Sequence, residues 1–206
     1  MEAISEIIPR QFIGSQTGAT SRLEADTRHE ALLLFQNASN RLMDINNWQK
    51  ICGGEGAEFT LTDKQGEKVN NGHPKIGDLI KIKLPGPANK EGEGFDWVRI
   101  EEFEDSKSLL SDSEVFGFRV RPVENPKNKT GNGAHFYTTD ATSTFLIIRY
   151  SHSVFALERG KNETPNDRGS WTTKIRNWVV ALAAMIGLSK PQWQRLMSGL
   201  LTPHSS

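Results

Sequence analysis

The first regular pattern of apolar positions along the chain has the period of an α-helix. Its members recur at steps of four, three, four and three, which places them on one stripe of a 3.6-residue repeat. They are Ala31, Phe35, Ala38, Leu42 and Ile45. Thr27 and Glu30 precede most of the stripe with the spacing of a capping box, in which a hydroxyl and a carboxylate satisfy free backbone N–H groups. We therefore predict a helix that begins near Thr27 and faces the core, with Trp48 packing back onto the fold behind it.

From Glu58 onward apolar and polar positions alternate, which is the period of a β-strand. Alternating stretches separated by glycine and proline predict several antiparallel strands. They cover residues 58–62, 67–69, 77–84, 95–103, 116–121, 143–150 and 153–159. The first two form a hairpin candidate, and the last two are predicted to pair through Ser151 and His152. Strict alternation in the fourth stretch puts five side chains on one face: Phe95, Trp97, Arg99, Glu101 and Phe103.

Helical spacing returns near the C-terminus. The apolar residues with this spacing are Ile175, Trp178, Val179, Leu182, Met185 and Ile186. We predict a helix from Ser170 to Gly187, because a glycine commonly ends a helix. Ser189 and Gln192 form a second capping box, so a short helix with the apolar face Trp193 to Leu200 should follow. The polar segment Gly160 to Gly169 is predicted to be the loop before the long helix.

This order of elements predicts an α+β fold class. We expect a curved antiparallel β-sheet wrapped around a long C-terminal helix, with an N-terminal amphipathic helix, because one sheet that curls around a terminal helix buries both apolar faces. A chain of 206 residues fits one hydrophobic core. We therefore predict residues 1–25 as an N-terminal arm and residues 26–206 as a single domain.

In its element order the chain resembles the START and polyketide-cyclase superfamily, whose fold is the helix grip. The resemblance rests on the helix Thr27 to Asp44 that runs into Asn47-Trp48, on Pro74-Lys75-Ile76-Gly77-Asp78 before a strand, and on the closing helix Ser170 to Gly187. That superfamily has a strand before the first helix, which would come here from the Gln11 to Gly14 region. The resemblance implies a cavity between the sheet and the closing helix that binds a small hydrophobic or amphipathic molecule.

Aromatic residues of the strands and the closing helix either line such a cavity or fill it. The predicted ligand-binding residues are Trp97, Phe118, Arg119, Arg121, His135, Phe145, Arg149 and Trp178. Arginines that face one cavity would clamp a carboxylate or phosphate, and the spacing of Arg119 and Arg121 puts them on one face. The alternative is that the arginines lie on the solvent side of the sheet, paired with acids such as Glu101 or Glu158.

Composition narrows the classes of partner. The 25 basic and 25 acidic residues cancel, so no global field favours nucleic acid, and we expect none as a partner. Cys52 is the single cysteine, which excludes an internal disulfide and indicates a reducing compartment, with a buried structural thiol. Residues 1–10 lack the features of a secretory signal, and the longest apolar run is shorter than the about 20 residues of a membrane span. The prediction is a cytoplasmic protein.

The five histidines show no pair at metal-binding spacing, so we predict no metal and no cofactor. A binder of small hydrophobic molecules without assigned catalytic residues is the first hypothesis. The second is a hydrolase-like or cyclase-like enzyme that acts on a small acidic substrate, with His135 or Asp140 as the base and one of the arginines as an anchor. The third is a protein-interaction module in which the Trp193 to Leu200 helix docks a partner or a second copy.

Overall fold

The computed structural model describes residues 5, 7–54, 56–70, 72–83, 95–110, 112–127, 140–163 and 191–202. Its elements are β1 (Ser15–Glu24), α1 (Arg28–Met43), the 3-10 turn η1 (Ile45–Asn47), α2 (Trp48–Ile51), β2 (Glu58–Thr62), β3 (Leu79–Lys83), β4 (Asp96–Ser108), β5 (Ser113–Val123), β6 (Thr142–Tyr150) and β7 (Ser153–Glu163). A helix of residues 191–201 follows, which we call the C-terminal helix. Within the described chain, seven strands form one sheet in the order β1-β7-β6-β5-β4-β3-β2, and each neighbouring pair is antiparallel.

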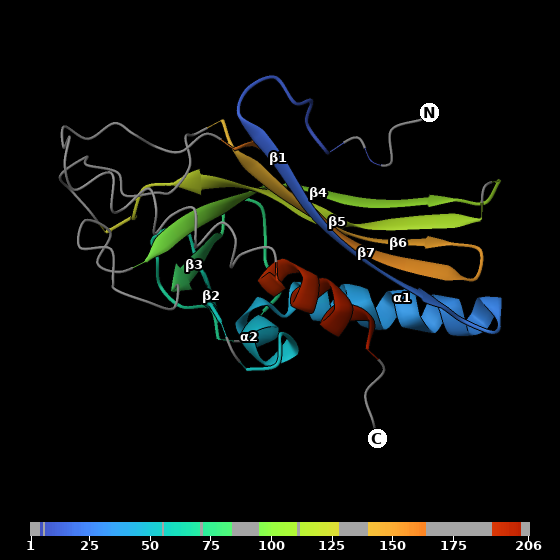
Figure 1. The fold of residues 1–206 in the computed structure, drawn as a ribbon. Helices are drawn as coiled ribbons and strands as arrows, with labels where there is room; N and C mark the ends of the chain where they lie inside the picture. Colours follow the sequence, from blue (N-terminus) through green and yellow to red (C-terminus); the bar gives the residue numbers. More distant parts are fainter. Residues whose placement is uncertain are drawn as a thin grey trace.

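The sheet is curved and twisted, and the helices lie together on one side of it (Figure 1). We call the side that packs against α1 and the helix of residues 191–201 the inner face, and the opposite side the outer face. Phe118 and Phe145 belong to the core of the inner face, whereas Leu146 packs with Ile7 on the outer face. The predicted α+β class with a curved antiparallel sheet, an N-terminal amphipathic helix and a C-terminal helix is confirmed.

The local signals for α1 act as predicted. The Thr27 hydroxyl accepts a hydrogen bond from the Glu30 N–H at 3.1 Å, and the Glu30 carboxylate accepts one from the Thr27 N–H at 2.9 Å. Both halves of the capping box therefore satisfy backbone donors that the first turn leaves free. The predicted apolar stripe is buried against the sheet: Ala31, Phe35, Ala38, Leu42 and Ile45. These contacts fix α1 across the inner face.

The helix of residues 191–201 corresponds to the short final helix in the sequence prediction, and the longer one predicted at Ser170 to Gly187 lies outside the described residues. Its apolar side is buried: Leu196, Met197, Leu200 and Leu201. Gln194 donates to the Thr20 carbonyl of β1 at 2.8 Å, and Arg41 of α1 donates to the Leu200 carbonyl at 2.9 Å. A guanidinium at a helix C-terminus satisfies free carbonyls there. The apolar face expected to dock a partner thus packs inside this chain.

A close approach of backbones seats this helix. A Cβ atom on Gly199 would overlap the backbone carbonyl of Ile51 at the end of α2. Backbone cannot move aside as a flexible side chain can, so glycine is required at this contact. The contact between Gly199 and Ile51 thereby seats the helix directly on α2.

The first strand differs from the prediction of an N-terminal arm. β1 spans Ser15–Glu24 and pairs with β7 along its length, so this part of the arm belongs to the sheet, and it lies later than the Gln11 to Gly14 region. β1 is an edge strand of mostly polar residues, and only Ala19 of it enters the core. The hydrophobic alternation that marks the other strands is therefore missing from its sequence.

A β-bulge interrupts β4 between Ile100 and Glu102. The extra residue reverses the alternation behind it, because a shift of one residue turns every later side chain to the other face. Phe103 therefore packs on the inner face beside Phe118, with ring centroids 5.5 Å apart. The prediction that Phe103 shares a face with Trp97 is wrong for this reason.

Two segments between strands also differ from the sequence prediction. β7 continues to Glu163, so the first four residues of the expected polar loop are strand, while residues 164–169 lie outside the described chain. The hairpin expected from residues 58–69 is short: Thr62 and Lys68 form one bridge, and backbone hydrogen bonds of 2.9 Å join Asp63 to Glu67 and Val69 to Leu61. Along its whole length β2 pairs with β3. Among the described residues, no helix has both the length and the apolar character needed to cross a membrane.

Candidate functional site

A cluster of aromatic rings covers the inner face where the sheet meets α2 and the C-terminal helix. It comprises Trp48, Phe59, Phe118, Phe145 and Trp193. Ring centroids are 5.2 Å apart for Trp48 and Phe145, and 5.3 Å apart for Phe145 and Trp193. These spacings are those of offset and edge-to-face ring pairs. Phe145 therefore stands between an indole from α2 and an indole from the C-terminal helix.

Trp48 anchors this aromatic cluster. Its ring is 1% exposed, and its indole N–H donates to the Leu42 carbonyl at 3.1 Å. A buried indole whose only donor is satisfied presents an otherwise apolar surface to its neighbours. The Trp48 ring stacks on Phe118 and meets Phe59 edge-on. The predicted role of Trp48 in packing back onto the fold is confirmed.

A buried carboxyl group lies beside the aromatic cluster. Glu158 of β7 stands directly opposite Phe145 of β6 and Ala19 of β1, so its side chain shares their inner face. Glu158 is 1% exposed, and neither carboxyl oxygen has a hydrogen-bond partner in the described chain. Burial, and secondly the charge of Glu163, raise the pKa of Glu158 to about 8. Burial favours the neutral form because a carboxylate loses its hydration there.

A second carboxyl group lies on the same face at the end of β7. Glu163 accepts a hydrogen bond from the Thr17 hydroxyl at 2.8 Å, while its other oxygen has no partner among the described residues. Burial raises the pKa of Glu163 also. A Cβ atom on Gly160 would overlap this carboxyl group, so the glycine gives it room on the inner face. We call Glu158 and Glu163 the acid pair.

The predicted ligand-binding residues divide between the two faces. Phe118 and Phe145 are members of the aromatic cluster. Trp97 is buried on the outer face, where the Lys81 ammonium lies 5.7 Å from its ring centroid. His135 and Trp178 lie outside the described residues. The structure therefore brings two of the predicted aromatic residues together and separates Trp97 from them by the thickness of the sheet.

Arg149 lies on the inner face at the end that is away from the acid pair, in an ion cluster. Its guanidinium contacts Glu114 at 2.7 Å and Asp112 at 3.0 Å, and it donates to the Ser151 carbonyl at 2.9 Å. Hydrogen bonds from Arg149, and secondly from Arg28, lower the pKa of Asp112. Burial opposes a similar decrease at Glu114, but hydrogen bonds from Lys107 and Arg149 outweigh it, so the pKa of Glu114 is lowered.

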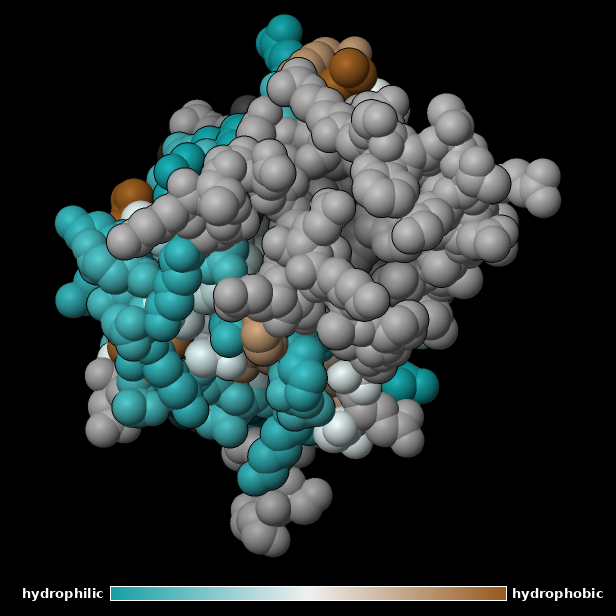
Figure 2. All heavy atoms as spheres, turned by 90° about the vertical axis from the view of Figure 1, so that its left-hand side faces the viewer, coloured by the Kyte–Doolittle hydropathy of each residue, from teal (hydrophilic) through white to brown (hydrophobic). Residues whose placement is uncertain are grey.

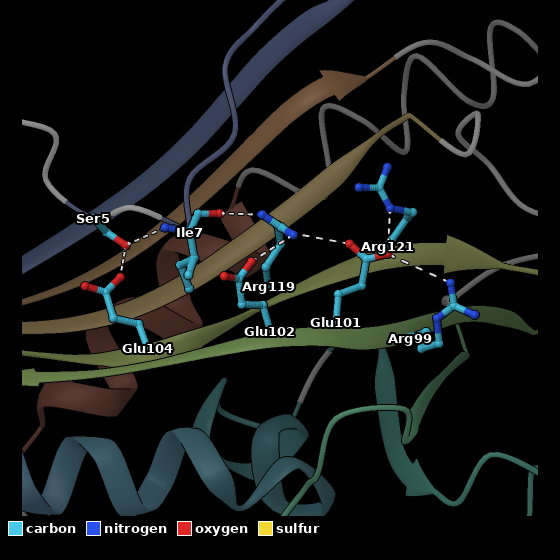
Figure 3. A network of polar contacts seen from close by, with 8 residues as sticks. All are labelled: Ser5, Ile7, Arg99, Glu101, Glu102, Glu104, Arg119 and Arg121. Carbon is cyan, nitrogen blue, oxygen red and sulfur yellow. Dashed lines mark hydrogen bonds and ion pairs between the residues drawn. The ribbon is translucent and has the colours of Figure 1, made fainter.

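Arg119 and Arg121 lie on the outer face, in the polar network of Figure 3. Glu101 forms ion pairs with Arg121 at 2.7 Å and with Arg119 at 3.4 Å, and Glu102 contacts Arg119 at 2.9 Å. The bulge explains how two consecutive acids reach one arginine, since it brings both side chains to the same side of β4. Pairing with Glu101 is the alternative that the sequence left open for these arginines.

The same network holds the N-terminal segment against the sheet. Arg119 donates to the Ile7 carbonyl at 3.0 Å, and the Ser5 hydroxyl donates to the Glu104 carboxylate (Figure 3). Ile7 is 4% exposed and packs on Leu146 and Leu157. Arg119 and Glu104 of the outer face thus hold this segment. The arginines among the predicted ligand-binding residues are divided between two faces, with Arg119 and Arg121 on the outer face and Arg149 on the inner face.

Glu158 is the functional candidate whose position sequence reasoning missed. The sequence suggested it as a partner for arginines on the solvent side, but the structure buries it on the inner face. A signal was present, because Val154, Ala156 and Glu158 alternate along β7 and the first two are core residues. An acidic residue at a core-facing position of a strand is the sequence pattern that indicates a buried carboxyl group.

The remaining candidate chemistry is dispersed. His29, His73 and His152 are exposed, and the described residues contain no group of three potential metal ligands. Cys52 is buried, and burial raises the pKa of its thiol to about 11, so the thiol stays protonated and unreactive. On the end of the molecule that Figure 2 faces, the described residues are mainly hydrophilic, with small hydrophobic spots among them.

The sequence matches no protein-family model and no curated protein. Several solved structures are similar. Norcoclaurine synthase from Thalictrum flavum, in complex with dopamine and hydroxybenzaldehyde, shares 9% identity over 93% of this chain and 90% of that chain, with a TM-score of 0.41. Major latex-like protein 151 from Panax ginseng shares 8% identity over 86% of this chain and 99% of that one, with a TM-score of 0.35. Ara h 8.0201 shares 5% identity over 92% and 100%, with a TM-score of 0.36.

The architecture of the chain itself determines its fold type. A single antiparallel sheet curves over a C-terminal helix that packs into its inner face. The fold is a helix grip. The resemblance that the element order suggested is therefore one of fold, and a fold alone specifies neither a ligand nor an activity.

Proposed function

We propose that this protein binds a small hydrophobic or amphipathic molecule on the inner face, between the sheet and the C-terminal helix. The observation that carries the proposal is the aromatic cluster, because its rings come from β2, β5, β6, α2 and the C-terminal helix and converge on one region. Binding sites for small molecules are concave, mainly apolar and aromatic, and contain a few polar groups. The aromatic cluster and the adjacent Glu158 have this composition.

The energetics favour an apolar ligand with ring or alkyl parts. Each 100 Å² of apolar ligand surface removed from water contributes roughly 2.5 kcal/mol before the costs of association. A ring that contacts Phe145 or Trp193 adds about 0.5–1.5 kcal/mol beyond this area term. A ligand of modest size therefore needs only partial enclosure by the aromatic cluster to bind with micromolar affinity, about −8 kcal/mol.

The neutral dye Nile red tests this proposal, because its fluorescence rises in apolar surroundings. We expect saturable binding to the full chain and at least fivefold weaker binding to Phe145→Leu, since leucine keeps the site apolar but removes the ring. Phe155→Leu is the matched control, because Phe155 packs on the outer face. Fluorescence titration measures both. Absence of saturable binding, or an equal loss in the two variants, would refute the proposal.

The enzymatic hypothesis and the interaction hypothesis have less support. Asp140 is exposed, and the arginines expected to hold an acidic substrate are paired with acids on different faces. The apolar side of the helix that was to dock a partner faces its own core. We therefore develop the ligand-binding proposal alone.

A further inference from the structure

We propose that the ligand carries a protonated amine, which forms an ion pair with Glu158 while its apolar body lies on the aromatic cluster. The inference rests on the proposed function and narrows it to one chemical class. Its starting point is the geometry of Glu158, which is held between Ala19 and Phe145 on the inner face of the sheet.

The unpartnered state of Glu158 requires an explanation. Buried side-chain polar atoms nearly always have a hydrogen-bond partner, and leaving one without a partner costs about 1–3 kcal/mol. Both oxygens of Glu158 lack a partner in the described chain, although Thr17 of the adjacent strand donates to Glu163. A carboxylate is an acceptor of several hydrogen bonds, so a ligand that donates N–H groups would satisfy both oxygens.

The charge around this position selects a cation. Glu163 lies on the same face, and its effect on Glu158 is that of a like charge. Arg159 acts in the opposite direction, but its guanidinium donates to the Ala19 carbonyl at 3.0 Å and to the Thr20 hydroxyl at 3.0 Å. The neighbours on β1 and β6, Ala19 and Phe145, carry no charge. An anionic ligand would oppose the ionisation of two acids here, whereas a cation stabilises the ionised form of both.

The aromatic cluster distinguishes an organic cation from a metal ion. A divalent metal ion needs several oxygen or nitrogen ligands, and no group of three potential ligands occurs among the described residues. The rings of Phe145 and Trp193 form instead apolar aromatic surroundings, which suit an ammonium group and the carbon atoms attached to it. The site therefore suits an amine with an alkyl or aryl body.

Proton linkage gives this ion pair a measurable signature. Glu158 is mainly protonated at neutral pH, since burial and Glu163 raise its pKa to about 8. An ammonium group favours the charged carboxylate, so amine binding at pH 7 releases close to one proton. Amine affinity should rise as the pH increases from 6 to 8 and then level off, until the amine itself loses its charge near pH ~10.

The matched pair hexylamine and 1-hexanol tests the inference by titration calorimetry on the full chain. We expect hexylamine to bind at least tenfold more tightly than 1-hexanol at pH 8.5. Glu158→Gln should remove this preference, because glutamine keeps the size of the side chain and loses the charge. Glu24→Gln, at an exposed position of β1, is the matched control and should keep the preference.

The outcomes separate the two proposals. Equal binding of amine and alcohol by the wild-type chain would overturn the inference and leave the proposed function standing. Binding of neither probe, together with no Nile red binding, would overturn both. A Glu158→Gln variant that weakens both probes equally indicates a structural role and also overturns the inference. Should that variant fail to fold by circular dichroism, the wild-type pH profile decides, because a flat hexylamine affinity between pH 6 and 8 contradicts the ion pair.

Discussion

Arg149, near the end of β6, shows how one residue can stabilise the contact between the ends of two strands, because it pairs with Glu114 near the start of β5. Arg149 and Glu114 are 6% and 7% exposed, so neither side chain is well hydrated in the folded chain. Removing one partner of a buried ion pair is strongly destabilising, because the other charge stays buried. The pair therefore behaves as a unit that tolerates the loss of neither member.

We predict that Arg149→Met lowers the free energy of unfolding by about 3 kcal/mol at pH 7. The value lies at the low end for a buried pair, because Lys107 still contacts Glu114 at 2.7 Å. Urea denaturation measures the change. Lys83→Met is the matched control, since Lys83 pairs with Glu58 in an exposed position and its loss should have little effect. Similar losses in the two variants would contradict the buried-pair account.

Partners distant in sequence explain why the role of Arg149 was not predicted. An arginine within an apolar strand suggests a ligand contact, but its acidic partners lie 35 and 37 positions earlier in the chain. Spacing along one element cannot reveal a partner on another strand. The inner-face positions of Phe118 and Phe145, in contrast, follow from alternation within their own strands.

At the scale of elements, the seat of the C-terminal helix on α2 gives a second prediction. Gly199→Ala should destabilise the protein by about 1–3 kcal/mol, because the added methyl group collides with the Ile51 carbonyl. The expected sign opposes helix propensity, which alone favours alanine over glycine by about 1 kcal/mol.

Thermal unfolding followed by circular dichroism checks this prediction, with Ser198→Ala as the control on the neighbouring, exposed position. Gly199→Ala should melt at a lower temperature than both the wild type and the control. A higher melting temperature for Gly199→Ala would mean that propensity dominates and that the helix is not seated on α2 by backbone contact.

Elements were predictable where their signals are local. The capping box and apolar stripe define α1, and β6 with β7 follow from alternation on both sides of a turn. β1 could not be predicted in this way, because it is an edge strand that is held by its pairing with β7 and buries little of its own surface. The β4 bulge was missed for a related reason, since an inserted residue leaves no mark in a sequence read with a constant period.

At the scale of the whole molecule, the buried and paired acids predict the pH of maximum stability. The pKa of Glu158 is raised from 4.5 to about 8 and that of Asp96 from 3.8 to about 7, in both cases first by burial. Stability from a raised pKa is complete below the unfolded value and is lost as the pH rises through the folded value. The pKa values of Asp112 and Glu114 are lowered, so their contribution is lost as the pH falls.

The loss of stability at alkaline pH and the loss at acidic pH together place the maximum of the free energy of unfolding at about pH 5, below the sequence pI of about 7.0. Urea unfolding from pH 3 to 10 measures the profile, and Glu158→Gln should flatten its alkaline limb because glutamine does not titrate. A maximum at pH 7 or above would contradict the assignment. Composition cannot supply this result, since 25 acids and 25 bases give no net charge regardless of which of them are buried.

The β4 bulge is the one place where that strand could lose a residue without reversing which side chains face inward. Before it, Trp97 points outward, and after it the inward residue is Phe103, so each half has its own phase. Losing one residue elsewhere in β4 would exchange inward and outward side chains along a whole half-strand. Losing Glu101 would instead cost the outer face its central acid. Natural variants of this chain should therefore carry insertions and deletions outside β4. Variants that keep the N-terminal segment should also keep Glu101, because Glu101 pairs with Arg119, which binds that segment.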